Sequence, residues 1–160
     1  MRMLRGQFIK AGSLSRPVPD DYIELEDIPV MRVRADLKGR GPPAAFDLLE
    51  SRLPTLRGRR FYGTCLELPE GREYYACVAL VDTDDPVKMQ LEKGVISGGR
   101  YLRRKIHDWV KMVEAGEIPK QFDDMARVHP QEIYPTKQSV EFYRSQTELH
   151  LLLPVKKLGS

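Results

Sequence analysis

Hydrophobic residues recur with two different periods along the chain, and these periods predict helices and strands in a repeating order. Apolar positions at helical spacing predict amphipathic helices over 43–53 and 119–128. Each helix begins at a proline, whose missing N–H costs nothing in the first helical turn. Runs rich in β-branched and aromatic residues predict strands over 22–37 (with a bend at Pro29), 61–68, 73–81, 100–107, 139–144 and 147–153.

The order strand, helix, strand, strand occurs twice, so we predict an α+β fold built from a duplicated βαββ unit. The predicted halves span about 21–82 and 95–157, and 1–20 is predicted to be a poorly ordered N-terminal arm. Residues 83–99 are interpreted as a polar crossing, and 109–113 as either a loop or an extra helical turn. Since each helix has a single apolar stripe, both helices should pack on one face of an antiparallel sheet. A ligand groove is then expected on the other face.

The composition fits a single folded domain of 160 residues, 41% of them hydrophobic and 31% charged. The net charge of +3 is too small to indicate a nucleic-acid-binding protein. The sequence shows no signal peptide and no apolar run of roughly 20 residues, the length that spans a membrane. We therefore expect a soluble, cytoplasmic protein in which Cys65 and Cys77 are reduced.

The sequence lacks the short motifs of the familiar cofactor and metal sites. It contains no Walker loop, no GxGxxG and no GxSxG. Its three histidines and two cysteines form neither a CxxC nor an HxxxH pair. We therefore expect no cofactor and no metal.

The last predicted hairpin carries the most informative polar residues. If Ser145-Gln146 is its turn, Glu141 opposes His150, and one face of the hairpin holds only apolar side chains that suit the helices. The opposite face then gathers Glu141, Tyr143, Glu148, His150 and Leu152. Carboxylates and an aromatic ring beside aliphatic surface suit a cationic or aromatic ligand, whereas a plain solvent-facing strand is the competing interpretation. A loop of odd length would change this register.

Further aromatic residues are candidates for lining the groove: Tyr62, Tyr74, Tyr75, Tyr101 and Trp109. The tyrosines are expected to divide between the core and the open face. The sequence leaves open which of the adjacent Tyr74 and Tyr75 faces the groove; Tyr75 is the one included among the predicted ligand-binding residues. Trp109 serves either as a packing residue or as part of the ligand platform.

Five short motifs follow one another along the chain. They are Phe61-Tyr62-Gly63, Tyr74-Tyr75-Ala76-Cys77-Val78, Ile96-Ser97-Gly98-Gly99-Arg100-Tyr101, Glu141-Phe142-Tyr143, and Thr147-Glu148-Leu149 running into Leu153-Pro154-Val155-Lys156. Their order and spacing resemble those of the GyrI-like (gyrase-inhibitor-like) small-molecule-binding domain. The same domain forms the effector-binding half of multidrug-responsive transcription regulators. The resemblance covers about 22–157.

The resemblance implies a pseudo-twofold domain that binds amphipathic, often cationic aromatic compounds beside an acidic residue surrounded by tyrosines. The acidic position of the family falls on Glu141, its tyrosine on Tyr143, and the glutamate before the last strand on Glu148. The glycine-tyrosine motif falls on Tyr101. The connection between the two last strands is shorter than in many members, and an alternative alignment puts the acidic position on Glu132.

Three functions are compatible with this resemblance. The leading prediction is a stand-alone module that binds cationic or neutral aromatic molecules; because an arm over 1–20 is too short for a helix-turn-helix domain, no direct DNA binding is expected. Some members resemble hydrolases of cyclopropane-bearing toxins, for which Glu141, Glu148 and Tyr143 are the candidate catalytic residues. The third function is that of a protein-interaction module of the gyrase-inhibitor type. The sequence leaves open whether the protein is an enzyme.

Overall fold

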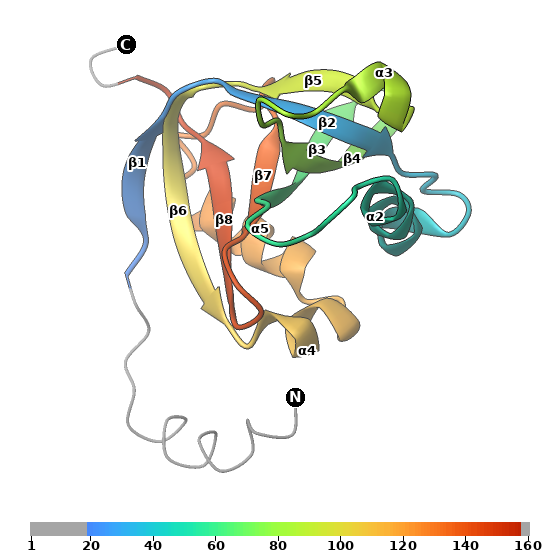
Figure 1. The fold of residues 1–160 in the computed structure, drawn as a ribbon. Coiled ribbons are helices and arrows are strands. Elements are labelled where there is room, and N and C mark those ends of the chain that lie inside the picture. The colour runs from blue at the N-terminus through green and yellow to red at the C-terminus, as the bar shows by residue number, and fades with distance from the viewer. Residues whose placement is uncertain (1–18, 158–160) are drawn as a thin grey trace.

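The computed structural model describes residues 19–157, so nearly all of the predicted N-terminal arm lies outside the described residues. In chain order the elements are β1 (Asp21–Leu25), β2 (Ile28–Arg34), α2 (Gly41–Ser51), β3 (Phe61–Leu68), β4 (Gly71–Ala79), α3 (Pro86–Met89), β5 (Glu92–Ile96), β6 (Gly99–His107), α4 (Trp109–Glu114), α5 (Ile118–Val128), β7 (Ser139–Tyr143) and β8 (Glu148–Pro154) (Figure 1). No helix within 19–157 is long and apolar enough to cross a membrane.

The strands form one antiparallel sheet in the order β1-β6-β8-β7-β3-β4-β2-β5. From one edge inward the order is β1, then β6, which precedes α5, then β8 and β7 of the last hairpin. From the other edge inward it is β5, then β2, which precedes α2, then β4 and β3 of the first hairpin. The two βαββ units therefore meet where β7 pairs with β3, a pair that we call the seam. The predicted α+β class, both long helices and both hairpins are confirmed.

Each edge strand pairs with the other half of the molecule. β1 leads into β2 through a connection of two residues, but it pairs with β6. In the same way β5 leads into β6 through two residues, but it pairs with β2. Where these connections cross, the carboxylate of Asp27 accepts a hydrogen bond from the amide N–H of Gly98 at 2.7 Å. The sheet curls into a half-barrel (Figure 1).

The sequence interpretation differed from the structure in two places, the bend near Pro29 and the crossing segment 83–99. The bend predicted at Pro29 lies instead at Glu26-Asp27, and of the two alternatives left open for 109–113 the structure shows the helix, α4. Strand β5 was missed, because Gly94 interrupts its apolar pattern. A side chain at position 94 would lie 2.7 Å from Nε of Arg32, so glycine leaves room for that arginine to cross the strand.

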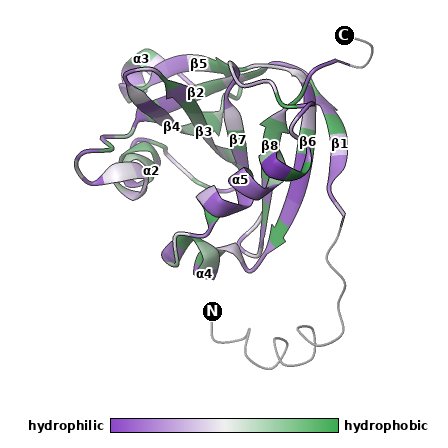
Figure 2. Ribbon diagram, turned by 180° about the vertical axis from the view of Figure 1, so that it is seen from behind, coloured by the Kyte–Doolittle hydropathy of each residue, from purple (hydrophilic) through white to green (hydrophobic). Residues whose placement is uncertain are grey.

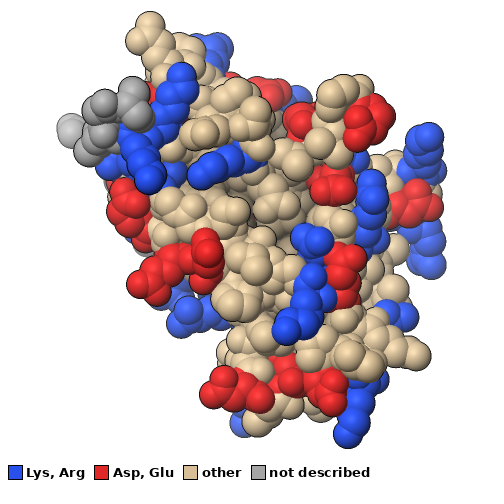
Figure 3. Space-filling view, turned by 90° about the horizontal axis from the view of Figure 1, so that it is seen from above, with Lys and Arg blue, Asp and Glu red and all other residues tan. Residues whose placement is uncertain are grey.

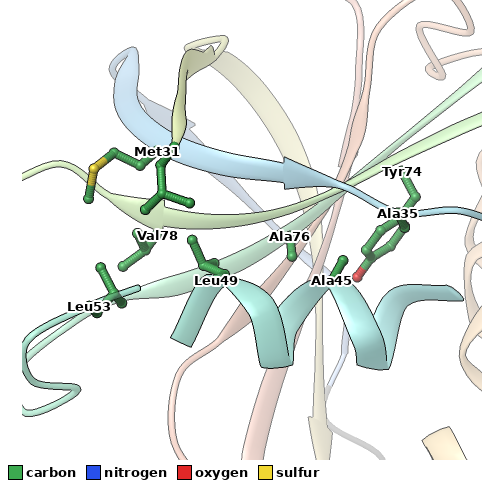
Figure 4. Packing of buried hydrophobic residues seen from close by; sticks show 9 residues of the cluster. Met31, Ala35, Ala45, Leu49, Leu53, Tyr74, Ala76 and Val78 are labelled. Atoms are coloured by element: carbon green, nitrogen blue, oxygen red, sulfur yellow. The ribbon is translucent and has the colours of Figure 1, made fainter. Parts of the chain in front are cut away.

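Both long helices cover the same face of the sheet, hereafter the helix face. Helix α2 packs Ala45 and Leu49 on Met31 and Val78 of β2 and β4 (Figure 4). Helix α5 packs Met125 on apolar residues of β6 and β8. Leu49 and Met125 are fully buried, and each such side chain contributes roughly 2 kcal/mol by leaving water. Helix α2 lies mainly against β2 and β4, and helix α5 lies against β8, so the two helices stand on either side of the seam (Figure 2).

The crossing of the two strand connections predicts a specific sensitivity to a side chain at Gly98. A Cβ there would lie 2.6 Å from the carbonyl oxygen of Leu25 and 2.8 Å from the amide nitrogen of Asp27. These are backbone atoms, so they cannot rotate away. We predict that Gly98→Ala lowers the free energy of unfolding by about 2 kcal/mol in urea denaturation.

Val87→Ala is the control for this measurement, since the Val87 side chain is 86% exposed. It should change the free energy of unfolding by less than about 0.5 kcal/mol. Equal effects of the two substitutions would show that the crossing tolerates a side chain.

Candidate functional site

The register of the final hairpin differs by one residue from the predicted register. β7 and β8 pair Glu141 with Leu151, so the prediction that Glu141 opposes His150 is wrong. The connection has odd length because Ser145 closes a local turn, in which its hydroxyl accepts hydrogen bonds from the N–H groups of Thr147 at 3.2 Å and Glu148 at 3.1 Å. Side-chain alternation therefore places Glu141 on the helix face, and the prediction that it faces away from the helices is also wrong.

Glu141 lies at the seam and is held there by two tyrosines. Its Oε1 accepts a hydrogen bond from the hydroxyl of Tyr74 at 2.5 Å and another from the hydroxyl of Tyr143 at 2.8 Å. Tyr74 belongs to β4, so the carboxylate joins the two halves. No described residue donates a hydrogen bond to Oε2, and the side chain is only partly buried. This oxygen is left for solvent or a ligand.

Gly63 is the residue directly opposite Glu141 across the seam. A Cβ at this position would overlap the phenol oxygen of Tyr74 and Oε1 of Glu141. The missing side chain lets the ring of Tyr74 lie across β3 and reach the carboxylate. Gly63 is therefore required by the site itself and not by a turn.

Aromatic rings from two helices pack on the two tyrosines that hold this carboxylate. The ring of Phe46, from α2, meets the ring of Tyr143 edge-on with centroids 5.4 Å apart, and Trp109, from α4, meets the same ring at 5.1 Å. Phe46 also lies 6.5 Å from the ring of Tyr74. The indole N–H of Trp109 donates to the carbonyl oxygen of Ser145 at 2.9 Å, which orients the ring. The site is thus a carboxylate bound by two tyrosines, whose rings contact those of Phe46 and Trp109.

Burial dominates the electrostatics of the site. It raises the pKa of Glu141, and the hydrogen bonds from the two phenols offset part of that effect. Burial and the adjacent carboxylate raise the pKa of Tyr74 well above its usual range, and they also raise the pKa of Tyr143. Both phenols therefore stay protonated and remain donors. No described lysine or arginine pairs with Glu141, so nothing in 19–157 neutralises its charge.

Three predicted site tyrosines lie on the opposite face of the sheet. Tyr62, Tyr75 and Tyr101 belong to an apolar cluster there and are 5%, 8% and 2% exposed. The hydroxyl of Tyr101 donates to the carbonyl oxygen of Ser97 at 2.6 Å. The prediction that Tyr101 and Glu141 line one cavity is wrong, because the strand register carries them on opposite faces.

Glu148 and His150 also lie on the opposite face, where they form a pair. Their Oε2 and Nε2 atoms are 2.7 Å apart. The hydrogen bond with His150 lowers the pKa of Glu148, while burial lowers the pKa of His150. At neutral pH the pair is therefore a carboxylate bound to an uncharged imidazole. The sheet separates it from Glu141.

Glu132, the alternative acidic position, has a different environment. Both of its carboxylate oxygens lie 2.8 Å from the hydroxyl of Tyr22, and Nδ1 of His129 is 3.1 Å from Oε2. These contacts tie the segment after α5 to β1. Glu141, in contrast, is the acidic side chain at the seam, so the geometry favours it as the acidic centre.

Sequence reasoning missed Phe46 and chose Tyr75 in place of Tyr74. A two-residue turn at Pro69-Glu70 pairs Cys65 with Tyr74, and this register puts Tyr74 on the same face as Gly63. The turn length was therefore the signal that could have identified Tyr74. Nothing in the helical periodicity distinguishes Phe46 from an ordinary packing residue.

The remaining reactive groups do not assemble into a metal site. Cys65 and Cys77 are free thiols that lie on opposite faces of the sheet. Within 19–157, no cluster of histidine, cysteine and carboxylate side chains is arranged to hold a metal ion.

No protein-family model matches the sequence, and no curated protein is detectably similar to it. Several solved structures are similar in three dimensions. The structure of SAV2435 bound to tetraphenylphosphonium has a TM-score of 0.60 at 13% identity, covering 88% of this chain and 96% of that chain. The EcmrR C-terminal domain has a TM-score of 0.56 at 14% identity, covering 88% and 98%. A hydrolase from Listeria innocua has a TM-score of 0.55 at 10% identity, covering 94% and 98%.

Similarities at such low sequence identity show a shared fold and nothing finer. The fold is that of GyrI-like effector-binding domains. The resemblance seen in the sequence motifs is therefore confirmed at the level of the fold.

The raised pKa of Glu141 predicts a stability effect with a definite sign. The folded protein holds the Glu141 proton more tightly than the unfolded chain does, so protonated Glu141 stabilises the fold. This stabilisation is full below the ordinary pKa of a glutamate, and it is lost as the pH rises through the pKa of Glu141 in the folded protein. We predict that Glu141→Gln raises the midpoint of thermal unfolding at about pH 8, and that the gain shrinks toward about pH 4. Circular dichroism melts across this range measure it.

Glu132→Gln is the matched control, because it removes a carboxylate that is not at the seam. It should show no gain that grows with pH. The same gain in the control, or none in Glu141→Gln, would contradict the assignment of the buried charge.

Proposed function

We propose that this protein binds small amphipathic molecules with an aromatic body, cationic or neutral, at the seam, beside Phe46 of α2 and Trp109 of α4. The observation that carries the proposal is the Glu141 carboxylate, which is bound by two tyrosines that contact the rings of Phe46 and Trp109, and which has no cationic partner among the described residues. A bound cation would supply that partner and lower the pKa of Glu141. Ring faces add a cation–π attraction of roughly 0.5–2 kcal/mol.

The structural comparisons support the same class of ligand. Tetraphenylphosphonium, present in the SAV2435 structure, is a permanent cation whose charge is surrounded by phenyl rings. Such an ion has no N–H donor, so it must be held by charge attraction and by ring contacts. A carboxylate bound by two tyrosines offers both.

The charge on the face seen in Figure 3 does not favour a polyanionic partner. Lysines and arginines are interspersed with acidic residues on the face seen in Figure 3. Such a mixture sums to a weak field, whereas recognition of nucleic acid depends on a continuous basic surface. A small molecule at the seam is the better-supported partner.

The central test compares two xanthene dyes of similar size and opposite charge. We predict that cationic tetramethylrhodamine methyl ester binds more tightly than anionic fluorescein, and that Glu141→Gln weakens binding of the cation by about tenfold or more. Fluorescence anisotropy titrations measure both affinities. Glu132→Gln is the control and should bind as the wild type does. Equal affinities for the two dyes, or no loss in Glu141→Gln, would exclude Glu141 as the selectivity determinant.

The affinity for the cationic dye should also depend on pH. Only the ionised carboxylate attracts the cation, so the affinity should rise as pH rises through the Glu141 titration. Because burial raises this pKa, the rise should extend above the usual range of a glutamate. Anisotropy titrations from about pH 4 to about pH 8 measure the profile. An identical profile in Glu141→Gln would assign the pH dependence to another group.

A second candidate function, hydrolysis of cyclopropane-bearing electrophiles, is favoured by one feature of the site. The site pairs a carboxylate oxygen that no described residue occupies with two protonated phenols. A carboxylate can activate water while a phenol donates to the departing electron density. Mass spectrometry of a cyclopropane-bearing alkylating agent after incubation tests for the ring-opened product. Product formation that is lost in Glu141→Gln while binding survives would put hydrolysis first.

A further inference from the structure

The two tyrosines that hold Glu141 have already committed their protons. The hydroxyl of Tyr74 donates to Oε1 of Glu141 at 2.5 Å, and the hydroxyl of Tyr143 donates to the same oxygen at 2.8 Å. A phenol has a single O–H donor, so each phenol oxygen keeps only acceptor lone pairs for a further contact. Tyr143 also contributes to the raised pKa of Tyr74, so the two phenol oxygens lie close together.

The second carboxylate oxygen of Glu141 is a further acceptor. Oε2 receives no hydrogen bond from any residue of 19–157, and the side chain is only partly buried. We call Oε2 and the two phenol oxygens the acceptor set. It presents three oxygens to a ligand and no donor, because both phenol protons point to Oε1.

The neighbouring donors are engaged elsewhere. Ser139 shares the helix face of β7 with Glu141, but its hydroxyl donates to the backbone carbonyl oxygen of Cys65 at 3.2 Å. The indole N–H of Trp109 donates to the carbonyl oxygen of Ser145 at 2.9 Å. Hydrogen bonds to the acceptor set therefore have to come from water or from a ligand.

The acceptor set distinguishes between two kinds of cation. A ligand that covers the set displaces the water that would otherwise donate to it. A permanent cation such as a phosphonium neutralises the charge of Glu141 but leaves the three oxygens without a donor, which is costly for polar groups taken out of water. A protonated amine neutralises the same charge and also donates charge-assisted hydrogen bonds. A site that hydrogen-bonds an N–H group discriminates strongly against an analogue without it.

We infer that the cationic group of the ligand is a protonated nitrogen with at least two N–H donors, one for Oε2 of Glu141 and one for a phenol oxygen of Tyr74 or Tyr143. Primary ammonium and amidinium groups have this form. The attached aromatic body then lies against Phe46 and Trp109, whose rings contact the tyrosines. This inference rests on the proposed function and adds to it the chemistry of the cationic group.

The test uses three compounds that share one ring system and one positive charge: 9-anthracenylmethylammonium, its N,N-dimethyl form and its N,N,N-trimethyl form. They carry three, one and no N–H donors. Methylation adds apolar surface and weakens the hydration of the cation, so rings and charge alone would favour the trimethyl compound. We expect the opposite order. The wild type should bind the primary ammonium about tenfold more tightly than the trimethyl compound in isothermal titration calorimetry at about pH 7.

Glu141→Gln tests whether the acceptor set causes this preference. The two phenols donate to the amide oxygen at the position of Oε1, so the amide N–H₂ takes the position of Oε2 and meets the ammonium as donor against donor. The variant should bind all three compounds more weakly and should lose the preference for the primary ammonium. Glu132→Gln is the matched control, since it removes a carboxylate away from the seam, and it should keep the tenfold preference.

The outcomes separate the inference from the proposed function. Equal binding of the three compounds, tighter binding of the trimethyl compound, or a preference that survives in Glu141→Gln overturns the inference. The proposed function still stands in these cases if Glu141→Gln weakens binding of the trimethyl compound, because that loss reports the charge alone. If none of the three compounds binds, or Glu141→Gln binds the trimethyl compound as tightly as the wild type does, the proposed function fails and the inference fails with it.

Discussion

On the helix face, the hydrogen bond from Tyr74 to Glu141 across Gly63 joins the two halves of the molecule between their separate apolar clusters. On the helix face the apolar residues gather in two separate clusters, one under α2 and one under α5. The seam between them would be an apolar contact in an ordinary sheet, yet it holds a carboxylate. Burying that group is costly unless it is hydrogen-bonded, so the two phenols are a condition of the fold as well as of the site.

The duplication of the βαββ unit explains why Glu141 has no second glutamate opposite it across the seam. Gly63 and Glu141 hold equivalent places in the two halves: they oppose each other across the seam, and each pairs outward with its own hairpin partner, Ala76 or Leu151. A strictly symmetric pair of glutamates would place two like charges side by side, and one of them would have to take up a proton. A glycine in the equivalent place avoids that repulsion and makes room for the phenol of Tyr74. The asymmetry between the two halves therefore creates the site.

The helices and strands of this fold could be predicted well from the sequence, because the spacing of their apolar residues is set by which side chains are buried. One apolar stripe on each helix and the two aromatic hairpins identified both βαββ units. The two faces of the sheet could not be told apart in the same way, since the strands at the centre carry apolar side chains on both faces: Leu151 lies under α5, while Leu152 lies in the opposite cluster. Alternation gave no signal there. The assignment of Glu141 to a face then depended on the length of one loop.

That loop links the register of the hairpin to the composition of the site. The hydroxyl of Ser145 closes the odd-length turn that puts Glu141 on the helix face. The backbone carbonyl oxygen of Ser145 accepts the hydrogen bond from the indole of Trp109, which lies beside Tyr143. A turn one residue shorter would move Phe142 to the helix face and turn the carboxylate toward the apolar cluster on the other side, away from Tyr74. The same turn would also release the tryptophan. The carboxylate and one wall of aromatic rings thus depend on a single residue outside the strands, and strand periodicity does not reveal that residue.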